Sequence, residues 1–297
     1  MRIGVDLGGS KIEIIAIDSA GGEVFRRRVR TPANDYRATL IAIAELVLAS
    51  ERALGIQATV GVGTPGSISA VTGILRNSNS VCLNGQPLRH DLEALLTREV
   101  RMANDANCFT LSESVDGAGR EAKVVFGVIL GTGVGGGIVV GGRVLSGVNG
   151  IAGEWGHNPL PLPRDDDLPL PACYCGRSGC IEAYLSGPGM TRDHLRVSGA
   201  PLEPPDIVAY AAGGDAQCEA TLKRYEARLA RALASVINIV DPDVVVLGGG
   251  ISNIGRLYEN VRSLWTAHIF SDSIATRLLP NQHGDSSGVR GAAWLWT

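Results

Sequence analysis

The chain lacks a long hydrophobic run, and it lacks an excess of charge of either sign. Its apolar stretches, such as VVFGVIL at 124–130, are far shorter than the ~20 residues that a transmembrane helix needs. This argues against a membrane-spanning protein. Lys and Arg number 27 against 30 Asp and Glu, a formal net charge of -3. The chain as a whole therefore offers no electrostatic attraction to nucleic acid or to an anionic membrane.

A signal peptide is also missing, and this favours the cytoplasm. Asp6 interrupts the first apolar stretch, and MRIGVDLGGSK predicts a strand and a turn from the first residues. Structural disulfides are disfavoured in the cytoplasm. Three of the six cysteines are clustered at 173–180, and such a cluster in a reducing compartment indicates a metal site.

Two common nucleotide-binding fingerprints do not occur. Neither GxGxxG followed by a helix nor GxxxxGK[ST] is present, so neither a dinucleotide-binding motif nor a P-loop is predicted. The chain has instead 39 glycines, many of them clustered in turns that follow apolar strands. These turns are DLGGSK at 6–11, LGTGVGGG at 130–137 and LGGG at 247–250.

A glycine turn after a strand exposes backbone N–H groups that suit phosphate oxygens. The first turn adds Asp6, Ser10 and Lys11, and the second adds the hydroxyl of Thr132. One such turn alone is more often a structural hairpin. Three in one chain, with an acid only on the first, favour a nucleotide held between two lobes. Asp6 would then serve magnesium through water, because this ion keeps several of its waters.

Apolar strands alternate with amphipathic helices, which predicts an α/β fold. Two strands flank the Gly-Gly turn within 2–18, and the same plan recurs at 124–145. The alignment of these segments places Asp6-Leu7-Gly8 over 131–133, which suggests two lobes of one design. Chance is the alternative, because both segments consist mainly of Gly, Val and Ile. Further strands are predicted at 59–66, 99–105 and 244–250, and helices at 37–54, 106–115 and 219–240.

The segment NDAN at 104–107 places a carboxylate at the end of a predicted strand, where ligand clefts of α/β proteins lie. Phosphoryl transfer to a hydroxyl needs a group that accepts the hydroxyl proton, and Asp105 is the candidate. The alternative is that Asn104 or Asp105 only caps the helix that begins near Ala106. Capping and catalysis are not exclusive.

A histidine and the clustered cysteines follow the spacing H-x15-C-x-C-x4-C. These residues are His157, Cys173, Cys175 and Cys180. Three thiolates and an imidazole make the closed tetrahedral set of a structural zinc site. A disulfide is disfavoured by the compartment and by the odd number of cysteines, and a reactive thiol would lack a nearby basic pair. The preceding LPLPRDDDLPLPA at 160–172 predicts a surface loop with the aspartates 165–167 in solvent.

Taken together, and in the order in which they occur along the chain, the motifs resemble those of the ROK family of sugar kinases. The resemblance rests on DLGGSK, GTPG (63–66), NDAN, LGTGVGGG, GEWGH (153–157), CYCGRSGCIE (173–182), VVLGGG and HGDSSGVRGAAWL (283–295). It implies an α/β, two-lobed actin-like ATPase (ribonuclease H-like) fold with a duplicated βββαβα core and a structural zinc site. The lobes would comprise 1–117 and 118–297, with a C-terminal helix at about 287–297 packing back on the first lobe.

The resemblance also implies roles for individual residues. Asp105 would be the general base. The sugar would be bound by Gly66, Asn79, Asn104, Asp105, Glu154, His157 and Glu182. The nucleotide would be bound by Asp6, Gly8, Gly9, Ser10, Lys11, Gly131, Thr132, Gly133, Gly248, Gly249 and Gly250. Zinc, bound by His157, Cys173, Cys175 and Cys180, would hold the glutamates in place, and Asp6 would serve the magnesium of MgATP.

Two segments, NSNSVCLNGQPL at 77–88 and AGEWGHNPLP at 152–161, favour the bacterial fructokinase (manno-fructokinase) branch. We therefore expect ATP-dependent phosphorylation of a hexose 6-hydroxyl, with D-fructose as the leading acceptor. An N-acetylglucosamine kinase, or a broad glucose and mannose kinase, is the alternative, because one sequence does not show whether the pocket has room for an acetamide. The family also implies a homodimer.

Two classes of protein without catalytic turnover are further alternatives. A sugar-binding sensor would share the pocket, but the intact Asp6 and Asp105 argue against it. A ROK repressor would have a DNA-binding helix-turn-helix ahead of the pocket, where only five residues precede Asp6. The sequence thus favours an enzyme.

Overall fold

The computed structural model describes residues 1–69, 71–78 and 80–296, and the chain divides into two compact units. Unit 1 comprises Met1–Glu121, Gly137–Gly153 and Gln282–Thr297, and unit 2 comprises Ala122–Gly136 and Glu154–Asn281. The boundary expected between residues 117 and 118 lies close to the first crossing of the chain between units. The expectation differs from these units in assigning 137–153 to the second lobe.

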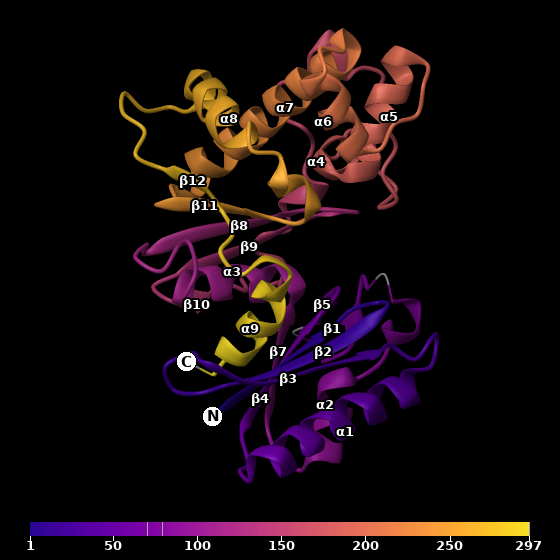
Figure 1. The fold of residues 1–297 in the computed structure, drawn as a ribbon, viewed down its shortest axis with the longest axis vertical. Helices are drawn as coiled ribbons and strands as arrows, with labels where there is room; N and C mark the ends of the chain where they lie inside the picture. Colours follow the sequence, from indigo (N-terminus) through magenta and orange to yellow (C-terminus); the bar gives the residue numbers. More distant parts are fainter. Residues whose placement is uncertain (70, 79, 297) are drawn as a thin grey trace. The chain divides into compact units, whose positions relative to one another are not determined.

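The sheet of unit 1 has five strands in the order β3-β2-β1-β4-β7 (Figure 1). They are β1 (Arg2–Leu7), β2 (Lys11–Ile17), β3 (Glu23–Arg30), β4 (Thr59–Thr64) and β7 (Val100–Asn104). The first three form an antiparallel meander, and β4 and β7 continue the sheet in parallel. Parallel strands place their carboxyl ends at one edge, so the turn after β1 and the end of β7 lie at the same edge.

Helices cover both faces of this sheet. Helices α1 (Tyr36–Leu54) and α2 (Leu88–Leu96) bury Ile3, Val5 and other core residues on one face. Helices α3 (Asp105–Val115) and α9 (Ser287–Trp294) lie on the other. The close approach of α9 requires glycine at position 61, where a Cβ atom would lie 1.8 Å from the carbonyl oxygen of Ala292. The C-terminal helix therefore packs on the same sheet face as Asp6.

The second sheet repeats the strand order of the first. Its order is β10-β9-β8-β11-β12, with β8 (Val124–Leu130), β9 (Val134–Val140), β10 (Arg143–Val144), β11 (Val244–Gly248) and β12 (Arg277–Pro280). In each sheet, the strand that comes first in the sequence, β1 or β8, is in the centre. The strand that comes third, β3 or β10, is at one edge. The duplication is thus visible in the topology, and the predicted α/β class is confirmed. The two sheets are consistent with actin-like lobes.

The helices of unit 2 lie between strands of the second sheet in the sequence. They are α4 (Ile181–Leu185), α5 (Gly187–Ser198), α6 (Pro204–Ala212), α7 (Ala216–Val240) and α8 (Leu257–Trp265). The shorter elements of the chain are β5 (Ser67–Ile68), β6 (Leu75–Arg76), η1 (Val81–Leu83), η2 (Trp155–His157), η3 (Asp165–Asp167), η4 (Gly250–Asn253), η5 (Thr266–His268) and η6 (Gly284–Ser286). Within the described ranges, no helix combines the length and the apolarity that crossing a membrane requires.

The local signals in the sequence explain where the long helices begin and end. The side chain of Asp35 accepts a hydrogen bond from Ala38 at the start of α1, and Gly55 ends this helix in the left-handed conformation. Asp215 caps α7 in the same way, and the helix stops at Asp241, directly before Pro242. The helices predicted from periodicity are confirmed to within three residues at each end.

Candidate functional site

Asn104 and Asp105 lie where β7 ends and α3 begins. Asn104 is the N-cap of α3, and its Oδ1 accepts a hydrogen bond from the backbone N–H of Asn107 at 2.8 Å. Asp105 Oδ1 accepts one from Ala106 at 2.8 Å. The capping alternative is therefore correct for Asn104. It leaves the carboxylate of Asp105 at the surface of unit 1, where a substrate can reach it.

The environment of Asp105 suits a proton acceptor. Desolvation by the surrounding protein raises the pKa of Asp105, although its side chain is accessible to solvent, and the hydrogen bond from Ala106 partly offsets this increase. A carboxylate with a raised pKa binds a proton more readily than an ordinary aspartate. Asp105 thus combines exposure to solvent with an increased affinity for a proton, two properties that a general base needs.

Asp6 is the last residue but one of β1 and lies at the same edge of the sheet. Burial raises the pKa of Asp6 to about 6, and the charges of Asp105 and Glu13 add to this effect, while Lys11 and Arg28 oppose it. Unit 1 thus brings the two predicted acids close enough for their charges to interact. A hydrated magnesium ion fits this place, because carboxylate oxygens are its preferred protein ligands and acidic neighbours increase its attraction.

The first glycine turn joins β1 to β2. Gly8 donates a backbone hydrogen bond to Lys11 at 3.0 Å, and Gly9 and Ser10 are exposed. Thr31 fixes the turn from the end of β3, with its hydroxyl on the carbonyl oxygen of Gly8 at 2.7 Å. No motif predicted Thr31, because its role depends on the pairing of β2 with β3. The exposed N–H groups of this turn can receive a phosphate.

Gly66 and Asn79 are the remaining sugar-binding candidates of unit 1. Gly66 has a φ of 82°, and a Cβ atom there would lie 2.4 Å from the carbonyl oxygen of Arg76. The backbone therefore requires glycine at position 66, whether or not it contacts a sugar. Asn79 lies outside the described residues, and its predicted role stays a prediction.

In unit 2, the second and third glycine turns lie next to each other. Gly249, after β11, has a φ of 80°, and a Cβ atom there would lie 2.4 Å from the carbonyl oxygen of Leu130. Leu130 directly precedes the turn that contains Gly131 and Thr132. The predicted nucleotide-binding residues of this unit therefore come together, as expected if both turns serve one ligand.

Glu182 lies in the first turn of α4 and contacts the second glycine turn. One of its carboxylate oxygens accepts a hydrogen bond from the backbone N–H of Val134 at 2.9 Å. A Cβ atom at Gly133 would lie 2.8 Å from the same oxygen. Glu154 precedes η2, where Trp155 is buried and donates to Gly135 at 3.0 Å. The turn and the two predicted sugar-binding segments are thus parts of one packed region.

The four predicted zinc ligands are brought together in unit 2. The ligand atoms of His157, Cys173, Cys175 and Cys180 all lie within 4.8 Å of one another. Cys173 Sγ is 3.7 Å from His157 Nδ1, and Cys175 Sγ is 3.6 Å from Cys180 Sγ. Ligands of tetrahedral zinc, with Zn–S bonds of about 2.3 Å, stand about 3.8 Å apart. The cluster therefore has the donor set and the spacing that zinc requires, and the cysteines, all within the described ranges, are unbridged.

Neighbouring residues orient this cluster. Tyr174 places its hydroxyl 3.0 Å from His157 Nε2, which leaves Nδ1 directed at the sulfurs. Such a second partner fixes the ring of a metal-binding histidine. Hydrogen bonds from Arg177 lower the pKa of Cys175 to about 6, whereas burial raises the pKa of Cys180 to about 12. A bound cation would favour the thiolate at each cysteine.

The loop at 160–172 corrects one expectation. Asp165 and Asp166 are exposed, as predicted, but Asp167 is buried. Its oxygens lie 2.6 Å from Arg228 Nε and 2.5 Å from Arg231 Nη2, on helix α7. Asp167 therefore fixes the segment that leads into the cysteines. No local pattern indicates this, because both partners lie more than 60 positions further along the chain.

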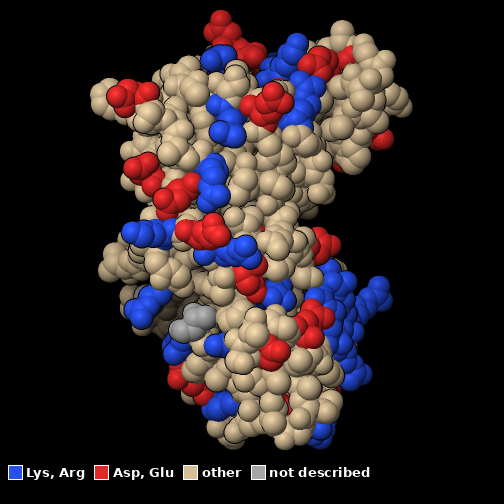
Figure 2. Space-filling view, turned by 60° about the vertical axis from the view of Figure 1, so that its left-hand side comes forward, with Lys and Arg blue, Asp and Glu red and all other residues tan. Residues whose placement is uncertain are grey.

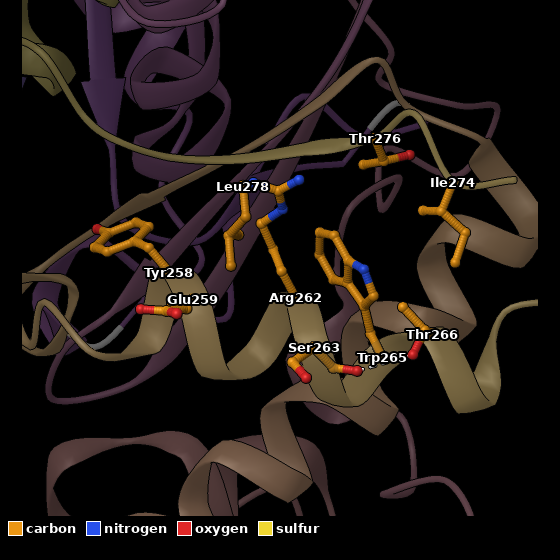
Figure 3. A pocket seen from close by; sticks show the side chains of 9 residues that line it. All are labelled: Tyr258, Glu259, Arg262, Ser263, Trp265, Thr266, Ile274, Thr276 and Leu278. Atoms are coloured by element: carbon orange, nitrogen blue, oxygen red, sulfur yellow. Dashed lines mark hydrogen bonds between the residues drawn. The ribbon is translucent and has the colours of Figure 1, made fainter.

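A groove of about 520 Å³ lies elsewhere in unit 2, between α8 and the segment that leads into β12 (Figure 3). It is lined by Tyr258, Glu259, Arg262, Ser263, Trp265, Thr266, Ile274, Thr276 and Leu278. None of these belongs to the predicted site. This groove is therefore separate from the candidate site, which is identified by its acids, glycine turns and cysteines.

Comparison with known proteins decides the family. The ROK family model matches residues 2–297. The chain belongs to the ROK family. The predicted resemblance is thus confirmed at the level of the family.

Individual members of the family show how far the similarity extends. The chain is 41% identical over 299 residues to the N-acetyl-D-glucosamine kinase of Escherichia coli O127:H6 (strain E2348/69 / EPEC), with 99% of both chains covered. A ROK hexokinase from Thermus thermophilus is 32% identical, with a TM-score of 0.88 over 99% of this chain and 96% of that one. A ROK family glucokinase from Streptomyces griseus, in complex with glucose and AMPPNP, is 27% identical, with a TM-score of 0.76 over 99% and 98%. These relatives do not support the fructokinase branch.

Proposed function

We propose that the protein is an ATP-dependent hexose kinase that phosphorylates the 6-hydroxyl of N-acetyl-D-glucosamine. The observation that carries this proposal is the 41% identity, over almost the full length of both chains, with a relative named N-acetyl-D-glucosamine kinase. The acids and glycine turns that such chemistry needs are present in this chain. The predicted alternative acceptor is thereby preferred to fructose.

In the proposed reaction, Asp105 accepts the proton of the sugar hydroxyl as that oxygen attacks the γ-phosphorus of ATP. The position of Asp105 after β7 and its raised pKa support this role. Asn104 holds the start of α3 and thereby fixes the direction of the neighbouring carboxylate. Phosphoryl transfer otherwise depends on positioning and on charge neutralisation.

The nucleotide is assigned to the three glycine turns and to Asp6. The exposed backbone of Gly9 and Ser10 would bind phosphate oxygens, and Lys11 would offset their charge. The turns at 131–133 and 248–250 would bind the remainder of the nucleotide. Magnesium, held at Asp6 through water, would supply neutralisation of the phosphate charge.

Glu154 and Glu182 are assigned to the sugar, because carboxylates accept strong hydrogen bonds from hydroxyl groups. His157 is assigned first to zinc, since its ring nitrogens face Cys173 and Tyr174. A direct contact between His157 and the sugar would require Nε2 to leave the hydroxyl of Tyr174. Zinc would have a structural role here, because the four protein ligands fill its tetrahedral shell.

The test is ADP release from the purified protein with MgATP and a panel of acceptors. The panel comprises N-acetylglucosamine, N-acetylmannosamine, glucose, mannose and fructose. We expect the highest kcat/KM with N-acetylglucosamine. A higher kcat/KM with fructose would restore the fructokinase prediction, and one with glucose would support the broad hexokinase alternative. Sugar binding without turnover on any acceptor would indicate a sensor.

A further inference from the structure

A buried acid lies beside Asp6 in the sheet of unit 1. Asp6 of β1 pairs with Glu13 of β2, and Glu13 pairs with Arg28 of β3. Residues directly opposite in antiparallel strands project from the same face, with their Cβ atoms about 4.5–5.5 Å apart. Asp6, Glu13 and Arg28 therefore form one row across the three strands, on the face that α9 covers.

Glu13 is only 1% exposed, and two arginines of β3 balance its charge. Arg26 forms an ion pair with its Oε1, and Arg28 Nε lies 2.9 Å from its Oε2. These arginine side chains are 31% and 47% exposed, so the balancing charges lie toward solvent. The buried part of the row is thus acidic, because Glu13 lies beside Asp6 and the arginines lie toward solvent.

A purely structural explanation accounts for only part of this row. Arginines on an edge strand prevent two sheets from pairing edge to edge, and β3 has four of them, at positions 26, 27, 28 and 30. Figure 2 shows Lys and Arg side chains gathered over part of unit 1. Edge protection does not require a buried glutamate on the adjacent strand.

Stability does not account for Glu13 either. Replacing a buried ion pair with apolar residues is often neutral or stabilising, and most buried side-chain oxygens accept at least one hydrogen bond. Glu13 Oε2 is buried, and it accepts no hydrogen bond from the described residues, even though Arg28 is within ion-pair distance. The charge itself is therefore the feature that needs an explanation.

We propose that Glu13 supplies part of the negative charge that attracts the magnesium ion of MgATP to Asp6, without coordinating that ion. Arg28 moderates this charge from the solvent side. The inference rests on the proposed function, because it requires the nucleotide to bind at the turn that follows Asp6. It adds a residue that none of the predicted motifs contains.

The experiment compares ADP binding by isothermal titration calorimetry in the presence and in the absence of magnesium. The absence of magnesium is achieved with metal-free buffer and no chelator, so that the cysteine cluster is left intact. The ratio of the two affinities measures how much magnesium strengthens nucleotide binding. The variants are Glu13→Gln, Arg28→Gln and the control Arg27→Gln, which removes the same charge from the opposite face of β3.

Loss of the buried charge makes the site less attractive to a cation and less repulsive to a nucleotide anion. We expect Glu13→Gln to lower the affinity ratio by roughly three- to tenfold, with metal-free ADP bound at least as tightly as before. Arg28→Gln should raise the ratio, and Arg27→Gln should leave it unchanged. General damage to the fold would weaken both affinities and could not produce changes of opposite sign.

An unchanged ratio in Glu13→Gln and Arg28→Gln, with wild-type ADP binding intact, would overturn the inference alone. Failure of the wild-type protein to bind ADP under either condition would overturn the proposed function, and the inference with it. If Glu13→Gln does not fold, Arg28→Gln decides, because its side chain is half exposed. A ratio that fails to rise in Arg28→Gln then counts against the proposal.

Discussion

The two sheets have the same strand order but different chemistry at corresponding turns. The turn after β1 follows Asp6, and the turn after β8 has Gly131 and Thr132 in its place. A carboxylate suits a cation, whereas backbone N–H groups and a hydroxyl suit phosphate oxygens. The duplicated scaffold thus fixes where a turn lies, and, on our proposal, one side chain determines which part of MgATP the turn binds.

The two sheets differ again in the connection that leaves the third strand of each sheet. The chain passes from β3 directly to α1, whereas a long segment with η2, η3 and the cysteine cluster lies between β10 and α4. This segment has little regular structure, and it is fixed by buried ion pairs and, on our proposal, by zinc. The two units should therefore respond differently to substitution: unit 1 in turnover, unit 2 in stability and sugar binding.

The largest effect is expected for Asp105→Asn, which removes the proposed proton acceptor. We expect kcat to fall by about 10²- to 10⁴-fold, with ADP affinity preserved. Steady-state kinetics with N-acetylglucosamine and calorimetry with MgADP provide the measurement. Asp165→Asn is the control, because it removes an exposed carboxylate of unit 2. A variant that keeps wild-type turnover would exclude Asp105 as the base.

The pH dependence of kcat/KM tests the same role of Asp105. Because the pKa of Asp105 is raised, a falling pH protonates it earlier than an ordinary aspartate, whose pKa is about 3.9. The base form is therefore lost at a higher pH, and we expect kcat/KM to decline on the acidic side above that ordinary value. A profile that stays flat down to about pH 4 would contradict a raised pKa for the catalytic base.

The next effect is on the stability of unit 2. Asp167→Asn leaves Arg228 and Arg231 buried with one charge unpaired, and such a loss costs about 3–5 kcal/mol. Lys223→Gln is the control, because it breaks an exposed pair with Glu219 and should cost about 0.5 kcal/mol or less. Denaturant unfolding of both variants tests the contrast. Equal losses would mean that the buried pairs do not stabilise the loop.

A smaller effect is expected from the cysteine cluster. Cys175→Ser should reduce bound zinc to well below one ion per chain, as measured by elemental analysis. If zinc positions Glu154 and Glu182, the KM for the sugar should rise by roughly 10- to 100-fold, with ADP binding retained. Cys82→Ser, outside the cluster, should change neither quantity. A normal sugar KM in zinc-free protein would refute the organising role.

Much of this architecture could be predicted from the sequence, because its signals are local. Periodicity predicted α1 and α7, glycine turns predicted the hairpins after β1 and β8, and cysteine spacing predicted the cluster at His157. Each of these signals lies within about 25 neighbouring residues. The strand order of the two sheets then agrees with the duplication that the two hairpins suggested.

The features that were missed depend on contacts between distant residues. Asp167 looked like a solvated loop residue, because its partners are on α7. No motif predicted a role for Glu13, and only the register of β1 with β2 places it beside Asp6. The relatives favour the predicted alternative acceptor over fructose, and the motifs of this chain did not distinguish the two sugars. The roles of Asp167 and Glu13 depend on ion pairs and strand register between distant residues, which no local pattern in the sequence reports.

The smallest contrast concerns two histidines, one in each unit. The hydrogen bond to Asp116, 2.9 Å from Nε2, raises the pKa of His283 in unit 1, whereas burial lowers the pKa of His268 in unit 2. Protonated His283 therefore stabilises the fold below its unfolded pKa of about 6.5, and this contribution is lost as the pH rises through the raised folded value. For His268 the sign is reversed: acid protonates it more readily in the unfolded chain, and stability falls below that pKa.

His283→Asn should therefore cost about 1 kcal/mol near pH 5.5 and much less near pH 8.5, as measured by denaturant unfolding. His268→Asn should show the opposite trend, with no loss of stability, or a slight gain, at the lower pH. Both substitutions remove one imidazole, so a difference between their pH trends in stability reports the surroundings of each histidine and not the chemistry of the ring. Parallel pH trends in the two variants would show that Asp116 does not hold the proton on His283.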